Sequence, residues 1–121
     1  MAERTLTITM DPDWRRALRA AASSAGAERY QGERLNFETP GAFFGHLTAR
    51  RWALVEMLMG AGELGVRELA RRAERDVKRV HEDVERLTEL GLVERTDRGG
   101  VICPYGNIHV DMHFHRAASA A

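Results

Sequence analysis

The strongest hydrophobic pattern in the chain runs from residue 76 to residue 91. Its apolar residues recur at steps of three and four, as they do along one face of an α-helix. They are Val77, Val80, Val84, Leu87 and Leu90. The opposite face carries Arg75, Lys78, Arg79, Glu82, Glu85 and Arg86, with the cations gathered toward the N-terminal end. This pattern predicts a helix over residues 76–90 that buries one face and presents a positive end to anions.

A shorter helix is predicted directly before this one. Residues 66–73 have apolar side chains at helical spacing, and only Glu74 and Arg75 separate them from the longer helix. Two short helices in this relation are typical of a helix-turn-helix.

A hairpin is predicted after the longer helix. Gly91 is suited to end that helix in a left-handed conformation. Residues 92–95 and 101–103 then flank the turn-forming segment 97–100, as the two strands of a hairpin do. A hairpin in this position corresponds to the wing of a winged helix.

Taken together, these segments resemble the winged-helix DNA-binding transcriptional regulators of prokaryotes that are related to the MarR group. The similar stretches are residues 65–73, 76–84, 87–93 and 101–111, and the resemblance extends back to about Arg34. It implies an α+β fold, with a winged helix-turn-helix domain over residues 48–116. It also implies a homodimeric repressor that reads double-stranded DNA with helix 76–90.

The residues before this domain predict a strand-helix-strand extension over residues 1–47. Residues 5–10 alternate between apolar and polar side chains as a strand does. Asp11 and Pro12 are suited to start a helix that ends near Ala25 and has Leu18 on its inner face. Residues 23–33 are loop-like. Residues 34–38 alternate again and are expected to pair with the first strand. Thr39 and Pro40 then start a short helix that holds Phe43, Phe44 and Leu47.

Residues 49–59 predict a helix that is apolar around most of its circumference. Such a helix is buried on more than one side, either between the two parts of the chain or between two subunits. We favour a dimer partner as the second contact. Residues 63–65 are expected to add a minimal strand to the hairpin, and residues 117–121 to form a disordered tail.

Local charge, not net charge, has to support any DNA binding. The 121 residues include 18 basic and 18 acidic side chains, so the formal net charge is zero. The cations are nevertheless concentrated around the predicted helix-turn-helix and hairpin. The DNA-binding candidates are Arg67, Arg71, Arg72, Arg75, Lys78, Arg79, His81, Arg95 and Arg98.

These candidates are expected to act in different ways. Lys78 and Arg79 lie where a recognition helix reads guanine, and Arg75 and His81 are expected to meet phosphate or a base edge. Arg71 and Arg72 are expected to meet backbone phosphates, and Arg95 or Arg98 the flanking minor groove. The carboxylates Glu82, Asp83 and Glu85 repel phosphate, which limits contact to the first two turns of the helix.

Two alternatives stay open at this stage. The resemblance also covers antitoxins, so the protein is alternatively an interaction module that neutralises a partner such as a toxin and represses its own gene. A second alternative is metal-responsive regulation through His109, Asp111, His113 and His115, which share one face of a predicted strand. One strand alone closes poorly around an ion, so no metal site is assigned.

The remaining features predict neither an enzyme nor a cofactor. There is no nucleophile turn, no glycine-rich phosphate loop and no isolated pair of carboxylates. The single cysteine, Cys103, has no internal disulfide partner and is expected to be a buried small residue of the hairpin. No signal or membrane-spanning segment is evident, so a cytoplasmic location is expected, without membrane contact.

Overall fold

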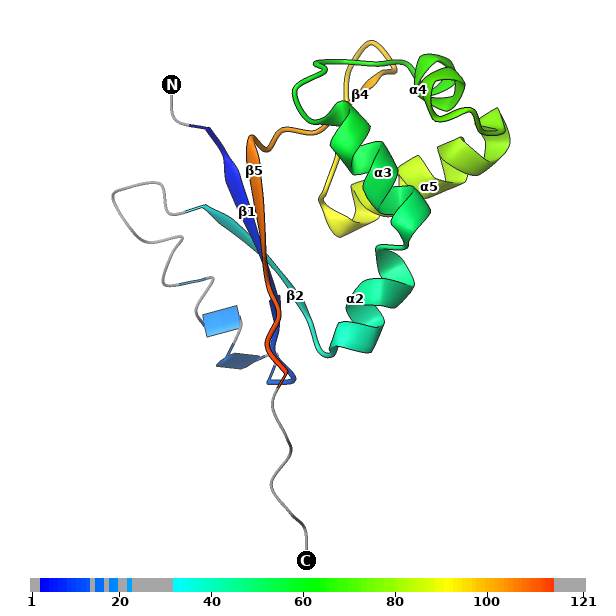
Figure 1. The fold of residues 1–121 in the computed structure, drawn as a ribbon. Coiled ribbons are helices and arrows are strands. Elements are labelled where there is room, and N and C mark those ends of the chain that lie inside the picture. Colours follow the sequence, from blue (N-terminus) through cyan, green and yellow to red (C-terminus); the bar gives the residue numbers. More distant parts are fainter. Residues whose placement is uncertain (1–2, 14, 17, 20–21, 23–31, 115–121) are drawn as a thin grey trace, which may run out of the picture.

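The computed structural model describes residues 3–13, 15–16, 18–19, 22 and 32–114 and has an α+β fold. Its named helices are α2 (Pro40–His46), α3 (Ala49–Leu58), α4 (Val66–Ala73) and α5 (Val77–Leu90). Its strands are β1 (Thr5–Met10), β2 (Glu33–Phe37), β3 (Glu94–Arg95), β4 (Val101–Ile102) and β5 (Asn107–Asp111). The helices α2 to α5 and the β3–β4 hairpin, which we call the helical unit, lie on one side of the sheet β2-β1-β5 (Figure 1).

The sheet joins the two ends of the chain. β1 is its central strand and pairs in parallel with β2 on one side and with β5 on the other. Ile8 of β1 stands opposite Leu35 of β2 and Val110 of β5. The expected pairing of the first two strands is therefore confirmed, and the C-terminal strand is added to the same sheet.

One hydrophobic core connects the sheet with the helical unit. Leu6 and Ile8, which alternate with threonines along β1, are 3% and 0% exposed. Their cluster continues through Phe37 and Phe43 to the buried residues of α3, α4 and α5. Because these side chains form one cluster, the sheet provides a wall of the core that the helices also need.

α3 is buried by several neighbours. Leu54, Val55 and Leu58 are at most 1% exposed, while Trp52 and Met57 are half-buried against the same core. The helix contacts both α4 and α5. The expectation that neighbouring parts of the chain bury this helix on more than one side is met, and a dimer partner against it stays a prediction.

Side chains cap the starts of three of the named helices, including the predicted start at Thr39 and Pro40. Thr39, Thr48 and Asp76 accept backbone N–H groups at the starts of α2, α3 and α5, and Gly91 ends α5 with a φ of 88°. Leu64 also forms the expected minimal strand, because it exchanges backbone hydrogen bonds of 3.0 and 2.8 Å with Val101 of the hairpin.

Some local expectations were wrong. The backbone N–H groups of Arg15 and Arg16 donate to Asp13, so Asp13 and not Asp11 caps the helical segment there. The expected short helix with Phe43 and Phe44 is present as α2. Phe44 is 57% exposed in it because neighbouring helical residues point about 100° apart and Phe43 takes the core-facing position.

Two further apolar residues are more exposed than their patterns predict. Val77 is 39% exposed to solvent because it is the first residue of α5 and precedes the part of the helix that reaches the core. Leu18 is 62% exposed to solvent. Residues 14, 17, 20–21 and 23–31 of the predicted helix and loop, His115 and the tail 117–121 lie outside the described residues.

Arg4 joins the sheet to the helical unit. Its Nε donates to Glu33 Oε2 of β2 at 3.0 Å, and its Nη1 lies 3.6 Å from Glu94 Oε1 of the hairpin. The guanidinium carbon is 5.2 Å from the ring centre of Tyr105, whose hydroxyl donates to the Gly91 carbonyl at 3.2 Å. The hydrogen bond to Glu33 raises the pKa of Arg4 above its usual range, so the cation persists.

None of the helices among the described residues combines the length and the apolar character that crossing a membrane requires.

The shared core predicts that damage to the sheet destabilises the helices. Ile8→Ala removes a fully buried side chain and is expected to lower the free energy of unfolding by about 2–5 kcal/mol. Urea unfolding followed by helical circular dichroism at 222 nm measures this loss. Thr7→Ala, on the other face of β1, is the matched control. A helical signal that unfolds identically in Ile8→Ala and the native protein would contradict a shared core.

Candidate functional site

The turn between α4 and α5 is tight and is closed by the backbone. Glu74 adopts a left-handed conformation with a φ of 55°, which is uncommon for a residue with a side chain. The Arg75 N–H donates to the Ala70 carbonyl at 3.0 Å, and Asp76 then accepts the Arg79 N–H at 3.2 Å. The chain thereby reverses from α4 into α5 within three residues.

A carboxylate of α5 fixes the orientation of this turn. Asp83 accepts from Arg51 Nε of α3 at 3.0 Å and from Arg75 Nη2 of the turn at 2.7 Å. Arg51 also donates through Nη1 to the His46 carbonyl at 2.9 Å. The three charged side chains are 14–24% exposed, so little water competes with their ion pairs. We call this group the Asp83 clamp.

Arg75 is therefore a structural residue in this arrangement. One of its terminal nitrogens binds Asp83, and the other, Nη1, is buried without a hydrogen-bond partner among the described residues. A side chain that is only 18% exposed has little surface to offer to DNA.

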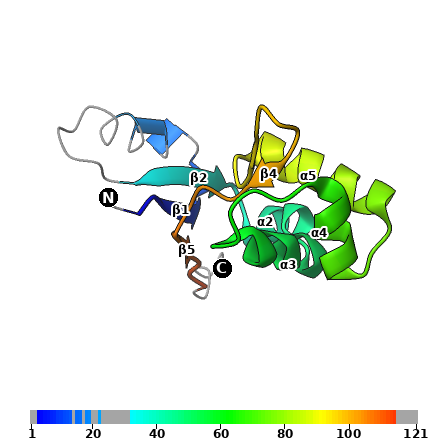
Figure 2. The same ribbon diagram turned by 90° about the horizontal axis from the view of Figure 1, so that it is seen from above.

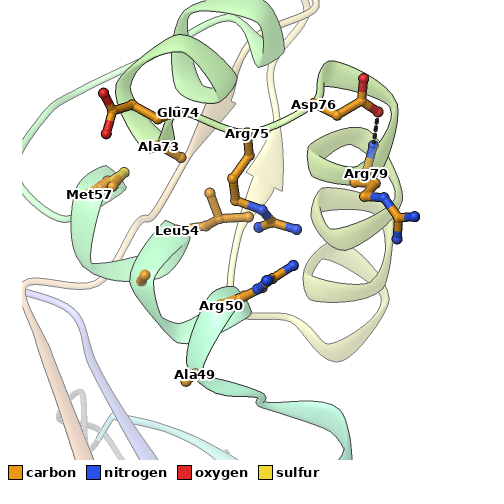
Figure 3. A pocket seen from close by; sticks show the side chains of 10 residues that line it. Ala49, Arg50, Leu54, Met57, Ala73, Glu74, Arg75, Asp76 and Arg79 are labelled. Atoms are coloured by element: carbon orange, nitrogen blue, oxygen red, sulfur yellow. Dashed lines mark hydrogen bonds between the residues drawn. The ribbon is translucent and has the colours of Figure 1, made fainter.

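A groove with a volume of about 570 Å³ lies between α3 and the start of α5. Arg50 of α3, Arg75 of the turn and Arg79 of α5 line it, together with the carboxylates Glu74 and Asp76. Figure 3 shows the Arg50 and Arg75 side chains reaching toward the same space from α3 and from the turn, while Glu74 points away from it. Because Asp83 neutralises Arg75, the positive charge that remains available to an anion at this groove comes from Arg50 and Arg79.

The cations at the start of α5 are available to a partner. Lys78 and Arg79 are exposed, and their charged side-chain groups have no hydrogen-bond or ion-pair partner in the part of the chain that the structure describes. Arg50 is also exposed, and its guanidinium group has no hydrogen-bond or ion-pair partner among the described residues. Since none of these charges is neutralised by a described residue, together they form an accessible positive surface beside the turn.

The cations of α4 are partly neutralised. Arg71 and Arg72 both bind Glu68, with Nε–Oε distances of 2.9 and 3.0 Å. These two hydrogen bonds lower the pKa of the Glu68 carboxyl to about 2, so the carboxylate stays charged near neutral pH. Arg67 is exposed on the same helix. The helix therefore offers less positive charge than its sequence suggests.

The hairpin approaches α5 through Arg95. The Arg95 Nη2 atom lies 3.4 Å from His81 Nδ1, and His81 Nε2 lies 2.9 Å from Glu85 Oε1. The structure thus brings together two candidates that are 14 residues apart in sequence. Arg98 is exposed in the turn between β3 and β4, away from these contacts.

The histidines of the C-terminal strand do not form a metal cluster in the described structure. His109 and Asp111 are exposed on β5, and His113 follows the strand. Within residues 3–13, 15–16, 18–19, 22 and 32–114, no three His, Cys, Asp or Glu side chains are grouped so that they could hold an ion. His115 lies outside these residues.

Cys103 is half-buried, with its Sγ atom 4.0 Å from the Tyr105 carbonyl. Burial raises the pKa of its thiol, which disfavours the reactive thiolate.

Sequence reasoning missed Arg50 and Arg51 and misjudged Asp83. Arg50 lies in the first turn of α3, and only the packing of α3 beside α5 brings it to the groove. Asp83 was expected to repel phosphate, whereas two arginines neutralise it inside the protein. One signal in the sequence could have indicated this role of Asp83. It lies about one turn from the buried Val80, near the core-facing side of a helix that carries many cations.

A family model matches residues 46–110, which is more than half of the chain. The chain belongs to the HVO_A0114 family. The matched residues include α3, α4, α5, the hairpin and nearly all of β5, and therefore the Asp83 clamp and the groove. No curated protein and no solved structure matches the chain.

The Asp83 clamp predicts a specific stability loss. Asp83→Ala leaves the guanidinium groups of Arg51 and Arg75 half-buried without their carboxylate, and we expect the free energy of unfolding to fall by about 2 kcal/mol. Urea titration measures the change, and Glu82→Ala, an exposed acidic neighbour, is the control. Equal stability of the two variants would show that the clamp does not hold the turn.

Proposed function

We propose that this protein is a winged helix-turn-helix transcriptional regulator that binds double-stranded DNA through the start of α5. The observation that carries this proposal is the set of exposed cations Arg50, Lys78 and Arg79, whose charged groups have no partner among the described residues. Arg50 and Arg79 line the groove beside the α4–α5 turn, and Lys78 precedes Arg79 at the start of α5. In this interpretation α3, α4 and α5 are the three helices of the domain, α5 is the recognition helix and β3–β4 is the wing.

Base reading is assigned to Lys78 and Arg79. Both belong to the first turn of α5, where a recognition helix approaches base edges in the major groove. Arginine and lysine donate to guanine O6 and N7, and each good base contact contributes about 1–3 kcal/mol of discrimination. We therefore expect a guanine in each half-site opposite this turn.

Backbone contacts are assigned to cations around that turn. Arg50, across the groove from Arg79, is suited to bind a phosphate beside the helix. Arg67 of α4 and Arg98 of the hairpin are exposed and are suited to flanking phosphates or the minor groove. Such contacts set the orientation of the protein on DNA and carry no sequence information.

The acidic residues of α5 are compatible with this interface. The Asp83 carboxylate binds two arginines and so adds little repulsion toward phosphate. Glu82 and Glu85 are exposed further along the helix, where they disfavour close approach to the DNA backbone. Contact is therefore concentrated on the first two turns of α5.

The first test is binding to fluorescent duplexes from the region upstream of the gene and to scrambled duplexes, each at two salt concentrations. We expect tighter binding to the upstream DNA and a preference that persists as salt rises. Weak binding that salt abolishes equally for both duplexes would overturn the proposal in favour of a protein partner of the antitoxin type.

Single substitutions separate base reading from phosphate binding. Lys78→Ala or Arg79→Ala is expected to reduce discrimination between sequences by about 1–3 kcal/mol. Arg50→Ala is expected to weaken all duplexes similarly and to lower the slope of log affinity against log salt by about one. Fluorescence anisotropy measures both quantities.

Arg86→Ala is the matched control for these variants. Arg86 lies on the same helix, but it is about two and a half turns from the N-terminus and is paired with Glu89. We expect this variant to bind DNA as the native protein does. If it weakens binding as much as Arg79→Ala, the start of α5 is not the recognition surface.

A further inference from the structure

The outer edge of β5 is open in the described structure. β5 pairs with β1 on one side, and among the described strands nothing pairs with its other side. Figure 2 shows β5 at the outside of the sheet, across β1 from β2. An unpaired edge presents backbone N–H and C=O groups that bind another strand readily.

The sequence of β5 carries only part of the protection that edge strands usually have. Edge strands are commonly protected by lysine, proline or a bulge, and Asn107–Asp111 contains neither of these residues and pairs with β1 in continuous register. Ile108 and Val110 pack against the core but remain partly exposed, and so does Met112 after the strand. Apolar side chains at this edge are thus only partly covered.

We infer that β5 is the dimerisation edge of this protein and that its occupant is β5 of a second copy. Two copies related by a two-fold axis through the edge pair in antiparallel orientation. With Val110 opposite its own counterpart, Ile108 faces Met112 of the second copy, and all apolar side chains stay on the core side of the sheet. The result is a continuous six-stranded sheet.

The polar face of the strand is self-complementary in this register. His109 of each copy stands opposite Asp111 of the other, so two pairs of an imidazole and a carboxylate form across the axis. Within one copy, the two side chains neighbour Thr7 and Thr9 of β1, which carry no charge. The charge pattern of β5 is therefore satisfied by a second β5 and not by its own sheet.

This arrangement also has a consequence for the helical unit. A two-fold axis perpendicular to the sheet keeps both helical units on the same face of the six-stranded sheet, because each packs on the face formed by Leu6 and Ile8. Both α5 helices then lie on one side of the dimer, as a two-fold DNA site requires. Only this consequence rests on the proposed function, since the dimer itself does not depend on DNA.

Charge swapping tests the register. Analytical ultracentrifugation of the full chain measures the dimer dissociation constant. His109→Asp places like charges opposite each other and is expected to weaken the dimer about tenfold. The double variant His109→Asp with Asp111→His restores opposite charges and is expected to regain most of the affinity. A native protein that is monomeric at all concentrations overturns the inference.

A cross-link tests the edge independently of charge. In a Cys103→Ser background, Val110→Cys brings two thiols together at the axis, where opposite Cα atoms of antiparallel strands are about 4.5 to 5.5 Å apart. We expect an oxidised dimer on non-reducing gels. Arg34→Cys, on the opposite edge strand β2, is the matched control and is expected to stay monomeric. Cross-linking through Arg34→Cys but not through Val110→Cys overturns the assignment, and circular dichroism verifies that each variant is folded.

Discussion

The shape of the helical unit depends on one carboxylate. Asp83 is 14% exposed and accepts hydrogen bonds from an arginine of α3 and from an arginine of the α4–α5 turn. A half-buried carboxylate without these partners would be costly, and so would the two guanidinium groups without it. The lowest free energy therefore requires α3, the turn and α5 to meet in one orientation. That orientation also fixes the direction in which Arg79 and Lys78 point.

The sheet imposes a second constraint because its central strand comes first in the chain. Parallel strands need long connections, and here the connection from β1 to its neighbour β5 contains the whole helical unit. Removing β1 would leave β2 and β5 without their shared partner and would expose Phe37 and Phe43 of the core. Arg4 adds a polar link between this strand and the hairpin. The N-terminal segment is thus part of the fold of the helical unit.

Local sequence signals predicted the elements well and their partners less well. The periodicity of α5, the helix start at Thr39 and Pro40, Gly91 and the Leu64 bridge all follow from short-range patterns, which physical chemistry restricts to few conformations. The parallel pairing of β5 with β1 does not follow from such patterns, because alternating apolar and polar residues indicate a strand but not the strand with which it pairs. Asp83 and Arg50 were missed for the same reason, since their roles depend on residues of other elements. Phe44 shows that a hydrophobic residue on a short helix need not reach the core.

The zero net charge of the chain has a clear physical meaning when the surface is considered locally. A highly basic protein attracts nucleic acid from any direction, whereas a neutral one has to present its cations in one place. Glu68 neutralises Arg71 and Arg72, and Asp83 neutralises Arg51 and Arg75. Arg50, Lys78 and Arg79, at the groove and the start of α5, keep charges that no described residue neutralises. A single small cationic surface binds long polyanions weakly, and two such surfaces on one rigid sheet bind far more tightly without any new contact. In the proposed dimer, pairing through the β5 edge would present two such surfaces to one duplex, so the dimer would bind DNA more tightly than the monomer.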